Sequence, residues 1–133
     1  MTTETQTRKI PAPLPNPENQ PYFDAAAKGT LLVGKCKDCG EFHFYPRRLC
    51  PHCFSANTEW LPAQGTGSIY TYSTMHRGVP VPYTIAYVTL DEGVSMMTNI
   101  VDCASDTIRI GQKVRVVFKP SDGGPPVPMF TQA

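Results

Sequence analysis

Two pairs of cysteines limit what the first half of this chain can fold into. They follow the pattern Cys-x2-Cys-x10-Cys-x2-Cys, and their members are Cys36, Cys39, Cys50 and Cys53. Each pair predicts a tight turn that presents two thiolates, and two such turns complete a tetrahedron of sulfur around one zinc ion, at about 2.3 Å per bond. The spacing therefore predicts a zinc ribbon, with a rubredoxin-type iron centre as the chemical alternative.

The expected role of this metal is structural. Four sulfur ligands leave a tetrahedral ion no position for water or substrate. Binding of a structural zinc contributes on the order of 10 kcal/mol to folding, which a ribbon this small does not obtain from its own core. His43 and His52 lie in or beside the pairs and are alternative ligands, although four cysteines already suffice. We therefore predict one structural Zn²⁺ and no catalytic residue.

The 133 residues are enough for one ordinary domain or for two small modules that share a core. Residues 1–18 end in regularly spaced prolines and predict a flexible arm, either a disordered leader or an arm that lies across a partner subunit. Residues 19–62 predict a short helix, capped by Asn19 and stopped by Gly29, and then the zinc ribbon, entered by a strand over 30–36.

Residues 63–133 have the composition of β-strands. Runs rich in β-branched and aromatic residues, bounded by Gly, Pro or Asp, occupy 67–75, 83–90, 94–101, 113–118 and about 127–131. Five short strands favour a small closed OB-fold barrel over a sandwich. The predicted fold class is therefore mainly β: a short N-terminal helix, a rubredoxin-like four-cysteine zinc ribbon and a five-stranded OB-fold barrel.

Candidate binding residues outside the cysteine pairs are few. Arg47 and Arg48 give the ribbon a local basic group, which is either a solvated face or a contact to an acidic partner surface or to the phosphates of a ligand such as coenzyme A. His76 and Arg77 precede a proline-stiffened loop, which is either a plain connector or a partner or substrate contact. No base is placed near Cys103 by the sequence, so we expect an unreactive, buried or strand-end thiol.

The charge balance argues against several classes of partner. The formal net charge is +1, so no overall positive field exists to attract nucleic acid or an anionic membrane. The predicted barrel carries five basic and five acidic residues, whereas a nucleic-acid-binding OB module needs a basic groove. Such a module is therefore the weaker alternative. No apolar run approaches the roughly 18 to 20 residues that span a bilayer, and no signal peptide is evident, so a cytoplasmic protein is expected.

The order of these pieces resembles the zinc-ribbon plus OB-fold family called domain of unknown function 35. The resemblance spans roughly residues 20–131 and rests on "YFDAAAKGTLLVGKCKDCG", "YPRRLCPHC", "GTGSIYTYSTM" and "IRIGQKVRVVF" followed by "PMF". It implies a non-catalytic accessory subunit of a thiolase-like enzyme: a thiolase, an acyltransferase or an acyl-CoA aldolase of lipid, aromatic or steroid metabolism. Only the four cysteines carry over from the family pattern, as zinc ligands.

The same resemblance implies a partner. The chain is expected to have no turnover on its own and to be required by a thiolase-fold catalytic subunit, which supplies the catalytic residues and binds most of the acyl-CoA. A hetero-oligomer such as a two-plus-two complex follows naturally, because thiolase-like cores are usually dimers.

Overall fold

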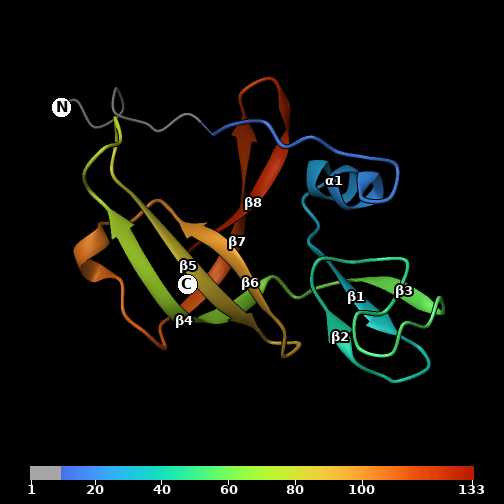
Figure 1. Ribbon diagram of the computed structural model, residues 1–133. Helices are drawn as coiled ribbons and strands as arrows, with labels where there is room; N and C mark the ends of the chain where they lie inside the picture. Colours follow the sequence, from blue (N-terminus) through green and yellow to red (C-terminus); the bar gives the residue numbers. More distant parts are fainter. Residues whose placement is uncertain (1–9) are drawn as a thin grey trace.

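The computed structural model describes residues 10–133, which form a β-barrel with a helix and a small ribbon beside it (Figure 1). The predicted fold class is confirmed: the described chain is mostly strand, with one short α-helix, a four-cysteine cluster and a closed five-stranded barrel. The first nine residues of the predicted arm lie outside the described part of the chain. No helix among residues 10–133 has the length and hydropathy required to cross a membrane.

Helix α1 (Gln20–Ala27) begins directly after Asn19, as the sequence predicts, and has Pro21 in its first turn. Its amino end differs in one respect, because the Asn19 side chain makes no cap to the helix. The Oδ1 atom of Asn19 instead accepts the N–H of Asn16 at 2.7 Å, and the Asn16 side chain accepts the N–H of Asn19 in return. Gly29, at φ 83°, ends the helix and turns the chain toward the ribbon.

The ribbon is a three-stranded antiparallel sheet of β1 (Leu32–Cys36), β2 (Phe42–His43) and β3 (Thr58–Pro62), in the order β2-β1-β3. Gly34 is central to it, since it lies opposite His43 on one side and Trp60 on the other. The loops that carry the cysteines connect these strands, so the sheet fixes where the two pairs lie.

The barrel closes in the order β4-β5-β6-β8-β7, and β7 pairs back onto β4. Its strands are β4 (Thr66–Met75), β5 (Tyr83–Leu90), β6 (Ser95–Ile100), β7 (Lys113–Ser121) and β8 (Gly124–Gln132), with a short 3-10 helix η2 (Ser105–Thr107) between β6 and β7. The five predicted strands are therefore present. The last strand begins earlier than predicted, at Gly124, within a proline-rich stretch.

The barrel has one weak seam, between β6 and β8. The only residue pair in register there is Ile100 with Phe130, whereas β8 pairs with β7 along most of its length. Proline has no N–H to donate to a neighbouring strand, and β8 contains three prolines. Two residues before this pair, the hydroxyl of Thr98 in β6 donates to the carbonyl of Pro128 in β8 at 3.3 Å and so connects the two strands.

The two halves of the molecule share one core. Ile69, Val88 and Phe130 are almost fully buried inside the barrel. Tyr22 from α1 and Val33 from β1 belong to the same cluster of buried side chains. Apolar area removed from water contributes about 25 cal/mol per Å², so the helix and the barrel stabilise each other.

The described end of the arm lies against the barrel and α1 (Figure 1). The N–H of Asp122, in the turn between β7 and β8, donates to the carbonyl of Ile10 at 2.8 Å, and Pro11 forms a bridge with the same residue. This part of the chain, although proline-rich, therefore has a defined path to Asn16.

Candidate metal centre and neighbouring surfaces

The sulfur atoms of the two cysteine pairs converge on one point at the end of β1. The Sγ atoms of Cys36 and Cys53 are 3.6 Å apart, as are those of Cys39 and Cys50. All four sulfurs lie within 4.8 Å of one another, and all four cysteines are free of disulfides. Sulfurs about 2.3 Å from one tetrahedral ion are spaced by about 3.8 Å. The donor set and its spacing therefore fit a single zinc ion.

The two turns that carry the sulfurs are built alike. The N–H of Gly40 donates to the carbonyl of Cys36 at 2.9 Å, and the N–H of Phe54 donates to the carbonyl of Cys50 at the same distance. Both residues directly follow a cysteine pair and have positive φ, 77° for Gly40 and 64° for Phe54. The same backbone path is thus taken twice, once by glycine and once by a bulky residue.

Backbone amides point at two of the sulfurs. The N–H of Cys39 donates to Cys36 Sγ at 3.4 Å, and the N–H of His52 donates to Cys50 Sγ at 3.3 Å. A hydrogen bond to a thiolate favours the charged form. The amide of Cys39 is the largest cause of a Cys36 pKa that is lowered to about 7. The first turn therefore favours the Cys36 thiolate, whereas at Cys39 and Cys53 a backbone hydrogen bond is outweighed by desolvation and the neighbouring sulfurs, so that the pKa of both thiols is raised.

Asp38 ties the first turn to the chain beyond the second. Its carboxylate accepts the hydroxyl of Ser55 and, at 3.1 Å, the side-chain amide of Asn57. The Ser55 bond, followed by the Asn57 bond, lowers the pKa of Asp38. The sequence analysis missed this role, because an isolated carboxylate in a turn gives no sign of a partner 17 residues away.

Neither histidine of the ribbon joins the four sulfurs, which among residues 10–133 form the only cluster of potential metal ligands. His43 is buried, and its Nε2 accepts the N–H of Arg47 at 3.2 Å. Burial, and then the charges of His52 and Arg47, lower the pKa of His43. His52 Nε2 lies 3.3 Å from the carbonyl of Phe42. Both rings therefore support the ribbon backbone.

Arg47 and Arg48 combine a fixed backbone with exposed side chains. The carbonyl of Arg47 accepts the hydroxyl of Thr58 at 2.9 Å and the indole N–H of Trp60 at 3.3 Å. The N–H of Arg48 donates to the carboxylate of Glu18 at 3.0 Å. Within the described chain neither guanidinium forms an ion pair, since Lys119–Asp102 is the salt bridge found there. The charged groups remain available to another molecule.

His76 and Arg77 lie far from this basic pair. They are exposed in the loop that follows β4, at the end of the barrel away from the ribbon (Figure 1). β4, ten residues long, runs from the ribbon side of the barrel to this loop (Figure 1), and at the usual rise of a strand it is about 30 Å long. The four predicted contact residues therefore form two separate groups.

Cys103 is half-buried in the wall of a hollow of about 700 Å³ that also contains Lys119 and Asp102. Burial, followed by the nearby charge of Asp102, raises the pKa of this thiol. No histidine is among the residues that line the hollow. An activated nucleophile needs an adjacent base or a lowered pKa. Cys103 has neither, so its surroundings are those of an unreactive thiol.

Comparison with known families covers most of the chain. Residues 23–59 match the family described as "ChsH2, rubredoxin-like zinc ribbon domain", and residues 60–119 match "ChsH2, C-terminal OB-fold domain". Among solved structures, a chain of the "Ltp2-ChsH2(DUF35) aldolase" superposes with a TM-score of 0.77 at 33% identity, covering 90% of this chain and 98% of that one.

Two curated relatives extend the comparison. A "Probable enoyl-CoA hydratase alpha subunit" of Thermomonospora curvata is 34% identical over 98% of this chain, which spans only 43% of that relative's length. The "Benzoylsuccinyl-CoA thiolase subunit BbsA" of Geobacter metallireducens is 29% identical, over 65% of this chain and 60% of the relative. The zinc ribbon, the barrel and their order along the chain agree with these matches. The chain belongs to the ChsH2-type zinc-ribbon plus OB-fold family, the DUF35 proteins.

Proposed function

We propose that this chain is a non-catalytic, zinc-containing subunit of a thiolase-like enzyme that acts on acyl-CoA: a thiolase, an acyltransferase or an acyl-CoA aldolase. The observation that carries the proposal is the match, over nearly the whole of both chains, to the DUF35 chain of an aldolase structure. A thiolase subunit among the relatives supports it. The catalytic residues and most of the acyl-CoA site would then belong to a thiolase-fold partner, in a complex such as a two-plus-two assembly.

The metal has a structural role in this proposal. Cys36, Cys39, Cys50 and Cys53 would hold one Zn²⁺, which fastens the two turns to each other and to β1. With four sulfurs bound, the ion offers no position for a substrate. The zinc would maintain the surface that the ribbon presents, and the reaction would take place on the partner.

An apolar face of the barrel supports a lasting protein contact. Side chains alternate along β5 and β6, so Ile85, Tyr87 and Met97 point outward while their neighbours are buried. Tyr87 and Met97 are directly opposite each other and are 48% and 59% exposed. We call these three residues the apolar face. The outward positions around it are uncharged: Thr71, Ser73, Met75, Tyr83, Thr89, Ser95 and Asn99.

A contiguous exposed apolar patch marks an interaction site more often than scattered apolar residues do. Because the proposed function requires one permanent partner, we expect the catalytic subunit to cover the apolar face. The guanidinium groups of Arg47 and Arg48 would contact the same subunit or the phosphates of its coenzyme A. His76 and Arg77, at the other end of the barrel, would make a separate contact.

Replacement of both arginines tests this contact without disturbing the ribbon. Arg47→Ala with Arg48→Ala keeps the backbone groups that bind Thr58, Trp60 and Glu18. We expect zinc content to remain at one ion per chain while the dissociation constant of the complex, or the KM for acyl-CoA, rises several-fold. Unchanged values for both constants would show that the two arginines contact neither the partner nor coenzyme A.

Turnover measurements test the proposed function itself. We expect the zinc-loaded chain alone to leave acyl-CoA thioesters unchanged, and a thiolase-fold partner to gain activity when the chain is added in equal amount. Thiolysis is followed by consumption of free coenzyme A and condensation by its release. Retro-aldol cleavage leaves the thioester intact, so it is followed by the ketone or aldehyde that it forms. Turnover by the single chain, or equal partner activity with and without it, would contradict the proposal.

A further inference from the structure

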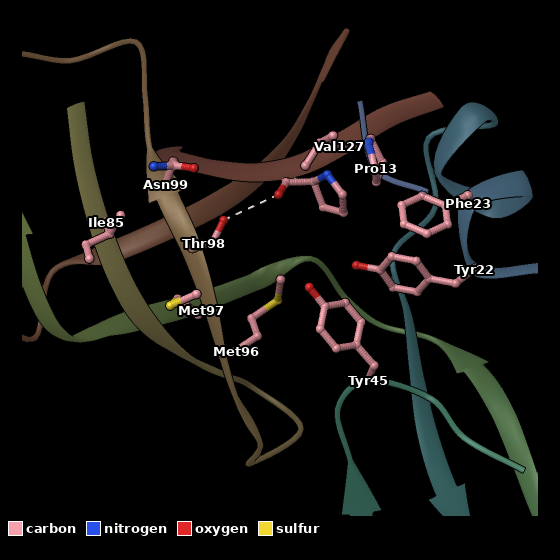
Figure 2. A pocket seen from close by; sticks show the side chains of 11 residues that line it. Pro13, Tyr22, Phe23, Tyr45, Ile85, Met96, Met97, Thr98, Asn99 and Val127 are labelled. Carbon is pink, nitrogen blue, oxygen red and sulfur yellow. Dashed lines mark hydrogen bonds between the residues drawn. The ribbon is translucent and has the colours of Figure 1, made fainter. Parts of the chain in front are cut away.

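A cavity of about 230 Å³ lies where the helix, the ribbon and the barrel meet. One wall is formed by α1 and the turn after β2, and the other by β6 and β8 at the weak seam of the barrel (Figure 2). The wall residues are Pro13, Tyr22, Phe23, Tyr45, Ile85, Met96, Met97, Thr98, Asn99, Val127 and Pro128. None of them carries a charge, so the cavity does not suit an anion or a cation.

Two phenol groups point into this cavity. Figure 2 shows the hydroxyls of Tyr22 and Tyr45 directed toward the space beside Met96 and Thr98. Tyr22 is 3% exposed as a residue, and its hydroxyl makes no hydrogen bond within the described chain. The buried polar side-chain atoms without a partner there are His43 Nδ1 and Glu92 Oε1, so the Tyr22 hydroxyl borders the open space of the cavity. The two rings pack edge to face, with centroids 5.5 Å apart. The Tyr22 hydroxyl therefore faces the cavity with its donor unused, and an acceptor inside the cavity would complete it.

The other polar groups of the wall already have partners. Thr98 donates its hydroxyl to the Pro128 carbonyl, and the side-chain amide of Asn99 donates to the carbonyl of Thr84 at 3.1 Å. Burial, and then the neighbouring Tyr45, raise the pKa of Tyr22. Its hydroxyl therefore stays protonated at neutral pH and is free to donate. The cavity combines apolar walls with two donors that face it.

We propose that this cavity binds a small, uncharged, mainly apolar molecule through an acceptor oxygen of the carbonyl class, which the hydroxyls of Tyr22 and Tyr45 hold. The size is suitable, since an apolar cavity of about 150 Å³ accommodates benzene. A benzene-sized group bearing one carbonyl fits the larger volume measured here. The inference goes beyond the proposed function and concerns this chain alone, so its failure would leave the proposed partnership intact.

Acetophenone is the probe, because it joins a benzene ring to one carbonyl. The full-length, zinc-loaded chain is labelled with ¹³C in its methionine methyl groups and titrated by NMR. Met96 and Met97 line the cavity, whereas Met75 and Met129 do not and serve as internal references. We expect saturable shifts of the first two methyl resonances at millimolar acetophenone. Ethylbenzene, which lacks the acceptor, and benzoate, which is charged, should bind several-fold more weakly.

Tyr22→Phe identifies the donor, since it keeps the packed ring and removes only the hydroxyl. One neutral hydrogen bond corresponds to a loss of acetophenone affinity of about three- to tenfold, and ethylbenzene binding should be unchanged. Tyr70→Phe is the matched control, because Tyr70 is exposed on β4 away from the cavity. The proposal is overturned if no saturation occurs, if the three probes bind equally, or if the folded Tyr22→Phe variant binds acetophenone as the native chain does.

Discussion

At the scale of single residues, Gly34 of β1 lies against the imidazole of His43 in the neighbouring strand. A Cβ atom added to Gly34 would lie 2.1 Å from His43 Nε2, far inside van der Waals contact. The imidazole cannot move away easily, because it is buried and accepts the N–H of Arg47. Glycine is therefore required at this position of β1 by the neighbouring ring.

Gly34→Ala is expected to lower the free energy of unfolding of the zinc-loaded chain by about 1–3 kcal/mol, the usual range for overpacking. Guanidinium denaturation followed by tryptophan fluorescence measures it, since Trp60 lies opposite Gly34. His43→Ala provides the control, because removal of the ring makes room for the added methyl group. The alanine at 34 should then cost much less in the His43→Ala background, and equal costs in both backgrounds would refute the steric account.

At the scale of elements, the two metal-binding turns offer an internal comparison. The chain takes the left-handed conformation after each cysteine pair, with Gly40 in the first turn and Phe54 in the second. That conformation costs a residue with a side chain about 1–2 kcal/mol, whereas glycine adopts it freely. Phe54 is 77% exposed, so its ring adds little packing to offset this cost.

We therefore expect opposite effects of substitution in the two turns. Gly40→Ala should weaken zinc binding about fivefold, which corresponds to about 1 kcal/mol, because nothing lies near the new methyl group and only the backbone is affected. Phe54→Gly should leave the affinity unchanged or raise it. Competition with a chromophoric chelator measures both, and a loss of affinity in Phe54→Gly would show that the exposed ring stabilises the turn.

The elements differ in how far the sequence predicts them. β5, rich in β-branched and aromatic residues and bounded by a proline before it and an Asp-Glu-Gly turn after it, has the predicted bounds, 83–90. β8 was predicted too short, because its prolines conceal a strand that pairs with β7. β2 has only two residues and β3 only five, and both exist because the cysteine turns bring them beside β1. A local pattern does not reveal pairing that depends on a distant element.

The candidate sites show the same division. The four cysteines were predicted to lie together from spacing alone, and their sulfurs do converge. The partnership of Asp38 with Ser55, and the facing hydroxyls of Tyr22 and Tyr45, depend on how separate segments pack. No periodicity in the sequence contains that information, so these sites required the three-dimensional structure.

At the scale of the whole molecule, the apolar face gives the proposed partnership a location. Tyr87→Lys with Met97→Lys would place two charges on it, and burying an unpaired charge is strongly unfavourable. We expect binding to the catalytic subunit to weaken at least a hundredfold in isothermal titration calorimetry. Both side chains are exposed in the free chain, so its folding should change little. Ala56→Lys is the matched control, because Ala56 is exposed on the ribbon. Equal binding by the native chain and all variants would exclude the apolar face as the contact with the catalytic subunit.

The most direct test of the central claim is the mass of the complex that the native chain forms. The tagged chain is purified from its own cell at micromolar concentration, its companions are identified by mass spectrometry, and the product is analysed by size-exclusion chromatography with light scattering. The account predicts one thiolase-fold protein, present in equal amount and co-eluting in a complex such as two plus two. Elution of the chain by itself, with every thiolase-fold protein in separate fractions, would contradict the account.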